Sequence, residues 1–75
     1  MIIRNKVILI LTEHAKEKMV LLDIDESDIE LAIIRGAKIK QTDGLLACYT
    51  YYCVAYKKIR EKVYKVKTVY IETRR

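Results

Sequence analysis

The chain has 75 residues, of which 52 % are hydrophobic and 33 % charged. This length allows one domain with a small core and leaves no room for a second. The composition is far from that of disordered segments, no apolar run approaches the roughly 20 residues of a membrane helix, and the N-terminal segment lacks the cleavage site of a signal peptide. We therefore predict a single folded domain over residues 1–75, cytoplasmic and without a membrane partner.

Charge is divided unevenly along the chain. Residues 13–35 contain seven acidic and three basic residues, whereas residues 36–75 contain ten basic and three acidic ones. The formal net charge is +5, with a pI near 9.3. A basic C-terminal part favours an anionic partner such as nucleic acid or an acidic protein, although the same charge could simply keep the protein in solution.

The N-terminal half predicts a strand followed by a helix. The run over residues 6–11 is apolar and too short for a helix, which indicates a buried strand. Thr12 can then cap a helix. The inward-facing residues of that helix are predicted to be Ala15, Met19 and Leu22.

A second helix is predicted directly afterwards. Asp25 and Asp28 have the spacing of a capping box, and Gly36 is placed to end the helix. Its predicted buried residues are Ile29, Ala32 and Ile33. Because only a few residues separate the two helices, we expect a helical hairpin.

The rest of the chain has the period of two that is typical of strands. Asp43 and Gly44 form the strongest short hairpin signal. Beyond them we predict one long strand over residues 45–56, a charged turn over residues 57–62 and a final strand over residues 63–73.

The two cysteines are predicted to be thiols. Cys48 and Cys53 would point to opposite faces of the same long strand, about 17 Å apart, which is beyond the reach of a disulfide. Two cysteines and one histidine also make a poor zinc site, so neither a metal nor a cofactor is expected.

The order β-α-α-β-β-β predicts an α+β fold, namely a four-stranded antiparallel sheet with a two-helix hairpin on one face. Its exposed edge strands would allow a homodimer. One face of the final strand is predicted to carry Tyr64, Val66, Thr68 and Tyr70, and the other Lys65, Lys67, Val69 and Ile71. The sheet face away from the helices would then be basic, with Lys38, Lys40, Lys65 and Lys67.

Three short motifs resemble a known family. They are His14-Ala15 with Lys18-Met19, the segment Ile24-Asp25-Glu26-Ser27-Asp28-Ile29, and Lys65-Val66-Lys67-Thr68-Val69-Tyr70. Together they are similar to a small uncharacterised domain family that is placed with the RelE/ParE-like toxins of toxin-antitoxin systems. This chain departs from the family by having Lys18 in place of an arginine and Leu22-Asp23 in place of an Arg-Gly pair.

The resemblance implies a toxin-like, metal-independent endoribonuclease that cleaves mRNA on the ribosome and is held inactive by a small acidic antitoxin protein. Members of the ParE type poison gyrase instead, so a toxin with a protein target is an alternative. A non-catalytic RNA- or protein-binding module on the same fold is another, and the missing arginines favour it.

Cleavage of the RelE type uses the 2′-hydroxyl of the RNA as nucleophile, so it needs a base, an acid and cations. His14 is the candidate base, because the dipole of a helix N-terminus favours the neutral imidazole that accepts a proton. Tyr70 is the candidate for a second proton transfer. The structural alternatives are that His14 caps the helix or bonds the strand and that Tyr70 fills the core.

The candidate nucleic-acid-binding residues are basic side chains of the C-terminal half: Lys38, Lys40, Lys57, Lys58, Lys65, Lys67 and Arg74. Lysines bind phosphate as point charges, so RNA binding is expected to be salt-sensitive and independent of sequence. The same surface could receive an acidic antitoxin tail, or it could be an ordinary solvated face.

Overall fold

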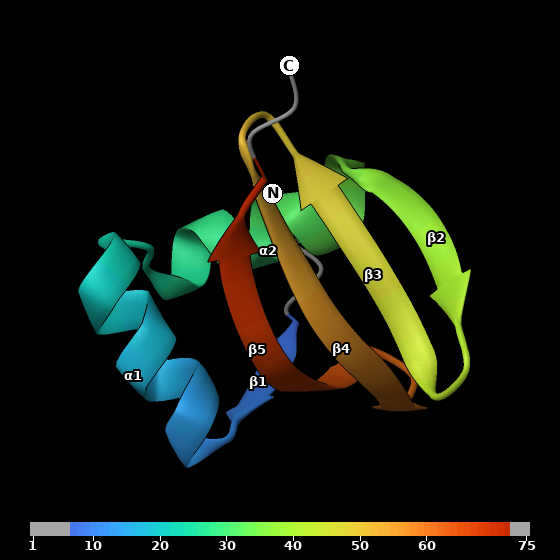
Figure 1. The fold of residues 1–75 in the computed structure, drawn as a ribbon. Helices are drawn as coiled ribbons and strands as arrows, with labels where there is room; N and C mark the ends of the chain where they lie inside the picture. The colour runs from blue at the N-terminus through green and yellow to red at the C-terminus, as the bar shows by residue number, and fades with distance from the viewer. Residues whose placement is uncertain (1–6, 73–75) are drawn as a thin grey trace, which may run out of the picture.

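A computed structural model describes residues 7–72 as two helices packed on a five-stranded sheet (Figure 1). In chain order the elements are β1 (Ile8–Leu11), α1 (Glu13–Leu22), α2 (Glu26–Arg35), β2 (Ala37–Gln41), β3 (Gly44–Tyr49), β4 (Tyr52–Arg60) and β5 (Val63–Ile71). The strand order is β1-β5-β4-β3-β2, with β1 parallel to β5 and every other pair antiparallel. Neither of the described helices is long and apolar enough to cross a membrane.

The predicted α+β class is therefore confirmed, but the four-stranded, wholly antiparallel sheet is wrong. The predicted strand over residues 45–56 is in fact two strands, because the chain turns at Thr50 and Tyr51. Thr50 lies in the left-handed region with φ 54°, which a β-branched residue rarely adopts. The predicted turn over residues 57–62 is correspondingly shorter, since β4 continues to Arg60.

Both helices begin and end where the sequence predicts. The Thr12 hydroxyl accepts the Ala15 N–H at 3.0 Å and caps α1. Asp25 and Asp28 form a reciprocal capping box at the start of α2, with both hydrogen bonds at 3.1 Å. These side chains satisfy backbone N–H groups that would otherwise lack partners at the helix ends.

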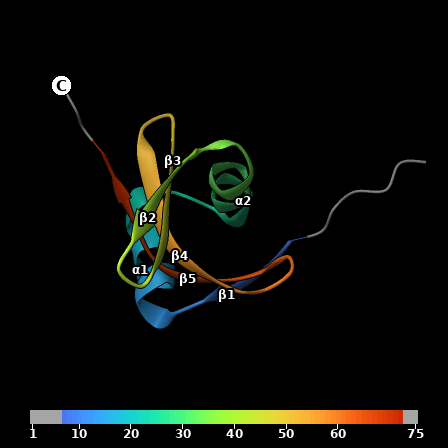
Figure 2. The ribbon, with the colours of Figure 1, turned by 90° about the vertical axis from the view of Figure 1, so that its right-hand side faces the viewer.

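The core lies between the helices and one face of the sheet. The predicted inward residues Ala15, Ile29, Ala32 and Ile33 are buried, and Met19 and Leu22 are partly buried against them. Their partners in the sheet include Val54, Val66 and Val69. Helix α1 packs along β5, whereas α2 covers β3 and β4, and Figure 2 shows the sheet curving around α2.

A bulge in β5 reverses the faces of the last strand. Ala55 pairs with Thr68 but Tyr56 pairs with Val66, so Lys67 is an extra residue in the ladder. One extra residue moves every later side chain to the opposite face. Beyond the bulge, the helix face carries Val69 and Ile71, while Thr68 and Tyr70 lie on the outer face. The predicted common face of Tyr64, Val66, Thr68 and Tyr70 is therefore wrong after Val66.

The faces of β2 are also the reverse of those predicted. Lys38 pairs with Ala47 and Lys40 with Leu45, and both partners contribute to the core. The two lysines therefore lie on the helix side of the sheet, where they are exposed on the edge strand. The prediction that they point away from the helices is wrong, because strand pairing sets the face and a single strand does not reveal it.

Tyr52 fastens α2 to the sheet. Its hydroxyl donates to the main-chain oxygen of Asp28 at 2.6 Å. Burial, together with the negative charge of Asp28, raises the pKa of Tyr52 to about 12. Tyr56, buried beside Tyr64 with ring centroids 5.5 Å apart, also has its pKa raised by burial. Both tyrosines thus belong to the helix face, which the sequence leaves open.

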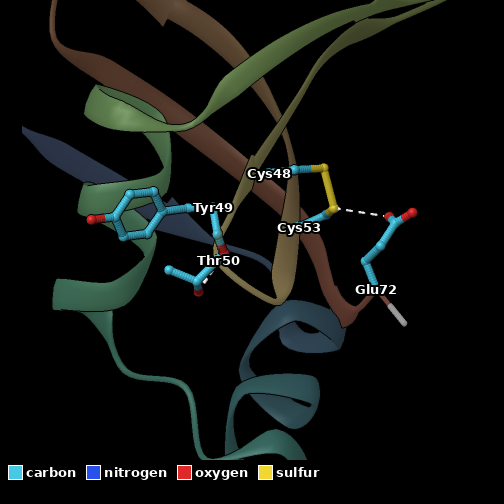
Figure 3. Close-up of a disulfide and its surroundings, with 5 residues drawn as sticks. All are labelled: Cys48, Tyr49, Thr50, Cys53 and Glu72. Atoms are coloured by element: carbon cyan, nitrogen blue, oxygen red, sulfur yellow. Dashed lines mark hydrogen bonds between the residues drawn. A yellow bond between two sulfur atoms is a disulfide. The ribbon is translucent and has the colours of Figure 1, made fainter. Parts of the chain in front are cut away.

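The turn at Thr50 and Tyr51 brings the cysteines together. Cys48 and Cys53 are direct cross-strand partners with Cα atoms 4.0 Å apart, and they form a disulfide (Figure 3). The prediction of two distant thiols is wrong because it assumed one continuous strand. At a close antiparallel pair, the side chains are near enough to be bridged.

Candidate nucleic-acid interface

A surface hollow of about 430 Å³ brings together four of the predicted site residues. Its lining comes from the start of α1, the β2–β3 turn, β4 and β5 and consists of Thr12, His14, Asp43, Lys57, Lys65 and Lys67. The predicted base and three of the predicted phosphate-binding lysines therefore meet at one place, although His14 is more than 40 residues from the nearest of these lysines in the sequence.

His14 is placed by the anchoring of α1 on β5. The Thr12 N–H donates to the Val66 oxygen at 3.3 Å, and the Thr12 hydroxyl donates to the Lys67 oxygen at 3.1 Å. His14 follows two residues later and is exposed. Its side chain makes no hydrogen bond or ion pair within residues 7–72, so the capping role that His14 could have had belongs to Thr12.

The lysines of the hollow are close to one another on the outer face. Lys57 and Lys65 are direct cross-strand partners, and like charges in this position destabilise a sheet. Lys67 is the extra residue of the bulge, which turns it toward the β2–β3 turn. Among the described residues, Lys65 forms no ion pair. Repulsion among these positive charges lowers the stability of the fold, and a bound anion would reduce that repulsion.

Asp43 is the single acidic residue in the lining. Its carboxylate lies 3.3 Å from the Lys57 Nζ and 3.5 Å from the Lys67 Nζ, which also donates to the Asp43 main-chain oxygen. The hydrogen bond and charge of Lys57, followed by the charge of Lys67, lower the pKa of Asp43. The Asp43 carboxylate thus lies between these two ammonium groups and pairs with both.

The turn that carries Asp43 depends on Gly44. Gly44 has φ 112°, a conformation that side-chain-bearing residues rarely adopt, and it pairs with Gln41 across the hairpin. A Cβ at this position would lie 2.5 Å from the Tyr56 main-chain oxygen. The predicted hairpin signal is therefore confirmed, and the glycine lets the turn approach β4 closely.

Tyr70 does not belong to this hollow. It pairs with Cys53 on the outer face, about 10 Å along β5 from Lys67. The structure therefore separates the two predicted catalytic residues, His14 and Tyr70. Tyr70 lies on the outer face because of the bulge at Lys67. Without the extra residue, Tyr70 would lie on the helix side of the sheet.

The other predicted basic residues are also elsewhere. Lys38 donates to the Gly36 oxygen at 2.7 Å, and Lys40 lies on the same side of β2. Lys58 lies 3.6 Å from Glu61 across the β4–β5 turn. Arg74 lies outside the described residues. Of the predicted basic face, the structure thus gathers only the part formed by β4 and β5.

Sequence reasoning missed two residues of the lining, Thr12 and Asp43. The sequence identifies Thr12 as a helix cap and Asp43 as a turn residue, and both are confirmed in those roles. Their presence in the hollow depends on contacts between distant segments, for which the sequence carries no local signal.

Comparison of the chain with protein-family models, with curated proteins and with solved structures finds no significant match. What is established is a small α+β fold in the order β-α-α-β-β-β-β.

Proposed function

We propose that this protein binds RNA through phosphate contacts at the hollow and cleaves it without a metal ion, as a toxin-like endoribonuclease of the RelE/ParE-like type. The observation that carries the proposal is the meeting of His14 with Lys57, Lys65 and Lys67. Cleavage by the 2′-hydroxyl requires a base, an acid and cations, and the residues of the hollow could supply all three.

The lysines supply the binding. An RNA phosphate between Lys57 and Lys67 would replace the Asp43 carboxylate, and Lys65 would be available to a second oxygen or to the next phosphate. Binding of this kind releases counterions, so the affinity falls steeply with salt and depends little on sequence.

His14 supplies the base. Its imidazole takes the proton of the 2′-hydroxyl, the freed oxygen attacks the adjacent phosphorus, and the bond from phosphorus to the 5′-oxygen breaks. The lysines stabilise the negative charge of the pentacovalent intermediate. Because Tyr70 lies outside the hollow, Lys65 is the proposed donor of the proton to the leaving 5′-oxygen. The products are a 2′,3′-cyclic phosphate and a 5′-hydroxyl.

A non-catalytic RNA-binding module is the second candidate, and one observation favours it. Asp43 already pairs with two of the three lysines of the lining, so the hollow is partly neutralised before any RNA binds. In either case the positive hollow suits a small acidic antitoxin, which would cover the lysines and block RNA together.

The test uses end-labelled single-stranded RNA and translating ribosomes, with a chelator present. Cleavage to fragments ending in 2′,3′-cyclic phosphate is expected, and His14→Ala should lower its rate by about 10²-fold or more while leaving RNA affinity nearly unchanged. Lys65→Ala should weaken binding. Lys40→Ala is the matched control, since it removes an exposed lysine from the opposite side of the sheet.

The remaining outcomes separate the candidates. RNA binding that depends on Lys65 without any cleavage would establish the non-catalytic module. Binding that Lys65→Ala and Lys40→Ala weaken equally would show that the hollow is not the site and would refute both candidates. Growth arrest on expression with intact RNA would point instead to a protein target.

A further inference from the structure

A second group of chemically reactive side chains lies at the other end of the sheet. Cys48, Cys53 and Glu72 place two sulfurs and a carboxylate within 4.8 Å of one another. Figure 3 shows the Glu72 carboxylate directed at the disulfide, with its Oε1 3.2 Å from the Cys53 Sγ. None of these residues lines the hollow that contains His14.

Two features of the fold create this group. The turn at Thr50 and Tyr51 sets the cysteines opposite each other on β3 and β4. Glu72 follows the end of β5, and its N–H donates to the Tyr51 oxygen at 2.8 Å. The backbone therefore holds the carboxylate beside the sulfurs.

The group opens onto a surface hollow of about 530 Å³. The lining residues are Ala37, Ile39, Cys48, Thr50, Tyr51 and Glu72. Cys53 is completely buried, whereas Cys48 and Glu72 are half-buried and reach the hollow. A small solute can thus approach the group from one side.

The contact with Glu72 suits the reduced cysteines better than the disulfide. A disulfide sulfur carries no hydrogen, so the carboxylate oxygen at 3.2 Å from Cys53 has nothing to accept from it. Once the pair is reduced, the Cys53 thiol can donate to Glu72. If both thiols lose their protons, two thiolates and a carboxylate stand together, and these are ligand types that a zinc-like cation accepts.

We propose that the reduced pair Cys48 and Cys53 binds one zinc-like divalent cation together with Glu72, with the fourth ligand position open to the hollow. In a tetrahedral zinc site a sulfur and a carboxylate oxygen are about 3.5 Å apart and two sulfurs about 3.8 Å. The first distance is nearly met in the present structure. Rotation of the cysteine side chains would provide the second, since their Cα atoms are only 4.0 Å apart.

Metal binding and the disulfide exclude each other, so the site is gated by the redox state. Reduction by a small-molecule dithiol breaks the sulfur–sulfur bond, moves two hydrogens onto the cysteines and leaves the reductant as its own disulfide. Binding of the cation then releases two protons from the thiols. An oxidised protein has no thiolate to offer, because both sulfurs are already bonded to each other.

Cobalt(II) is a suitable probe, because its spectrum reports thiolate ligands and tetrahedral geometry directly. The full chain, reduced and kept free of oxygen, is titrated with Co²⁺. The expected result is a thiolate-to-cobalt charge-transfer band with tetrahedral ligand-field bands that saturate at one ion per chain and disappear when Zn²⁺ is added. The oxidised protein should give none of these bands.

Variants identify the ligands. Cys48→Ser should abolish the charge-transfer band or reduce it to that of one thiolate. Glu72→Gln keeps both sulfurs and the hairpin, and it should weaken Co²⁺ binding at least tenfold. Glu61→Gln, which alters an exposed carboxylate in the β4–β5 turn, is the control and should bind like the unmodified protein.

Three results would overturn the proposal. They are the absence of a charge-transfer band in the reduced protein, saturation at one ion per two chains, and equal affinity of Glu72→Gln and Glu61→Gln. The second would mean that cysteines of two molecules share the ion. The third would mean that the carboxylate takes no part.

Discussion

The hydroxyl of Thr12 at the start of α1 donates to the main-chain oxygen of Lys67 in β5, 55 residues further along the chain, at 3.1 Å. The same hydroxyl oxygen accepts the Ala15 N–H and so caps the helix. One side chain therefore joins the helix that carries His14 to the bulge that carries a lysine of the proposed RNA site. The bulge and the cap together determine how close the imidazole lies to the ammonium groups.

Replacing Thr12 should affect both stability and the proposed site. Thr12→Ala removes the cap and should lower the free energy of unfolding by about 1 kcal/mol, measured by urea denaturation. Thr12→Ser keeps the hydroxyl and should recover most of the loss. The rate of RNA cleavage by Thr12→Ala should fall by more than the fraction of unfolded protein accounts for, because His14 is no longer held beside Lys67. Equal stability of the two variants would contradict the capping role.

Removing the acid of the hollow should strengthen RNA binding. Asp43→Asn releases Lys57 and Lys67 from their ion pairs and takes away the one negative charge of the lining. The affinity should rise, and the slope of log affinity against log salt should steepen by about 0.7 for each additional RNA phosphate that the lysines neutralise. Fluorescence anisotropy at several salt concentrations measures both.

Glu61→Gln provides the control for that change, since Glu61 pairs with Lys58 away from the hollow. An equal gain in the two variants would show that only net charge matters. A loss of affinity in Asp43→Asn would mean that Asp43 positions the lysines and does not compete with phosphate.

Tyr52 should make the protein sensitive to alkaline conditions. Because the pKa of Tyr52 is raised from 10.0 to about 12, the folded state favours the neutral phenol. The associated stability is present below the ordinary pKa and is lost as the pH rises through the raised one. The free energy of unfolding should therefore decrease between pH 10 and about pH 12.

The variant Tyr52→Phe isolates this effect. It loses the hydrogen bond to the Asp28 oxygen and should be less stable by about 1 kcal/mol near neutral pH. Its stability should then decrease less than that of the unmodified protein in the alkaline range. Tyr51→Phe, at an exposed neighbouring position, should keep most of the alkaline decrease, because burial and Asp28 raise the pKa of Tyr52 more than Tyr51 does. Parallel pH profiles for all three proteins would refute the assignment to Tyr52.

The disulfide should add measurable stability to the β3–β4 hairpin. The bond closes a short loop, for which the chain-entropy model gives about 2 kcal/mol. Urea denaturation in metal-free buffer, with and without a reductant, should show a loss of this size. Cys48→Ala with Cys53→Ala should be insensitive to the reductant. If the urea midpoint does not change on reduction, the disulfide adds no stability beyond that of the other contacts of the hairpin.

The helices and most of the core could be predicted from the sequence because their signals are local. The Thr12 cap, the Asp25 and Asp28 capping box and Gly36 each act within one helical turn. The apolar residues repeat at helical spacing, and those predicted to face inward are buried or partly buried. For the same reason His14 could be placed at a helix start and Lys65 and Lys67 on a strand, whereas Lys57 was predicted in a turn and in fact lies on β4.

The sheet and the proposed sites were decided by tertiary structure. No glycine, asparagine or aspartate marks the turn at Thr50, and no local pattern reveals the bulge at Lys67. The turn and the bulge each change which residues of neighbouring strands are paired. A change of one residue moves the side chains of a strand to the opposite face of the sheet. Such pairings explain three findings: the disulfide, the position of Tyr70 outside the hollow, and the closeness of Asp43 to Lys57. Contacts between distant segments carry no signal in either segment alone, so they become visible only in the folded chain.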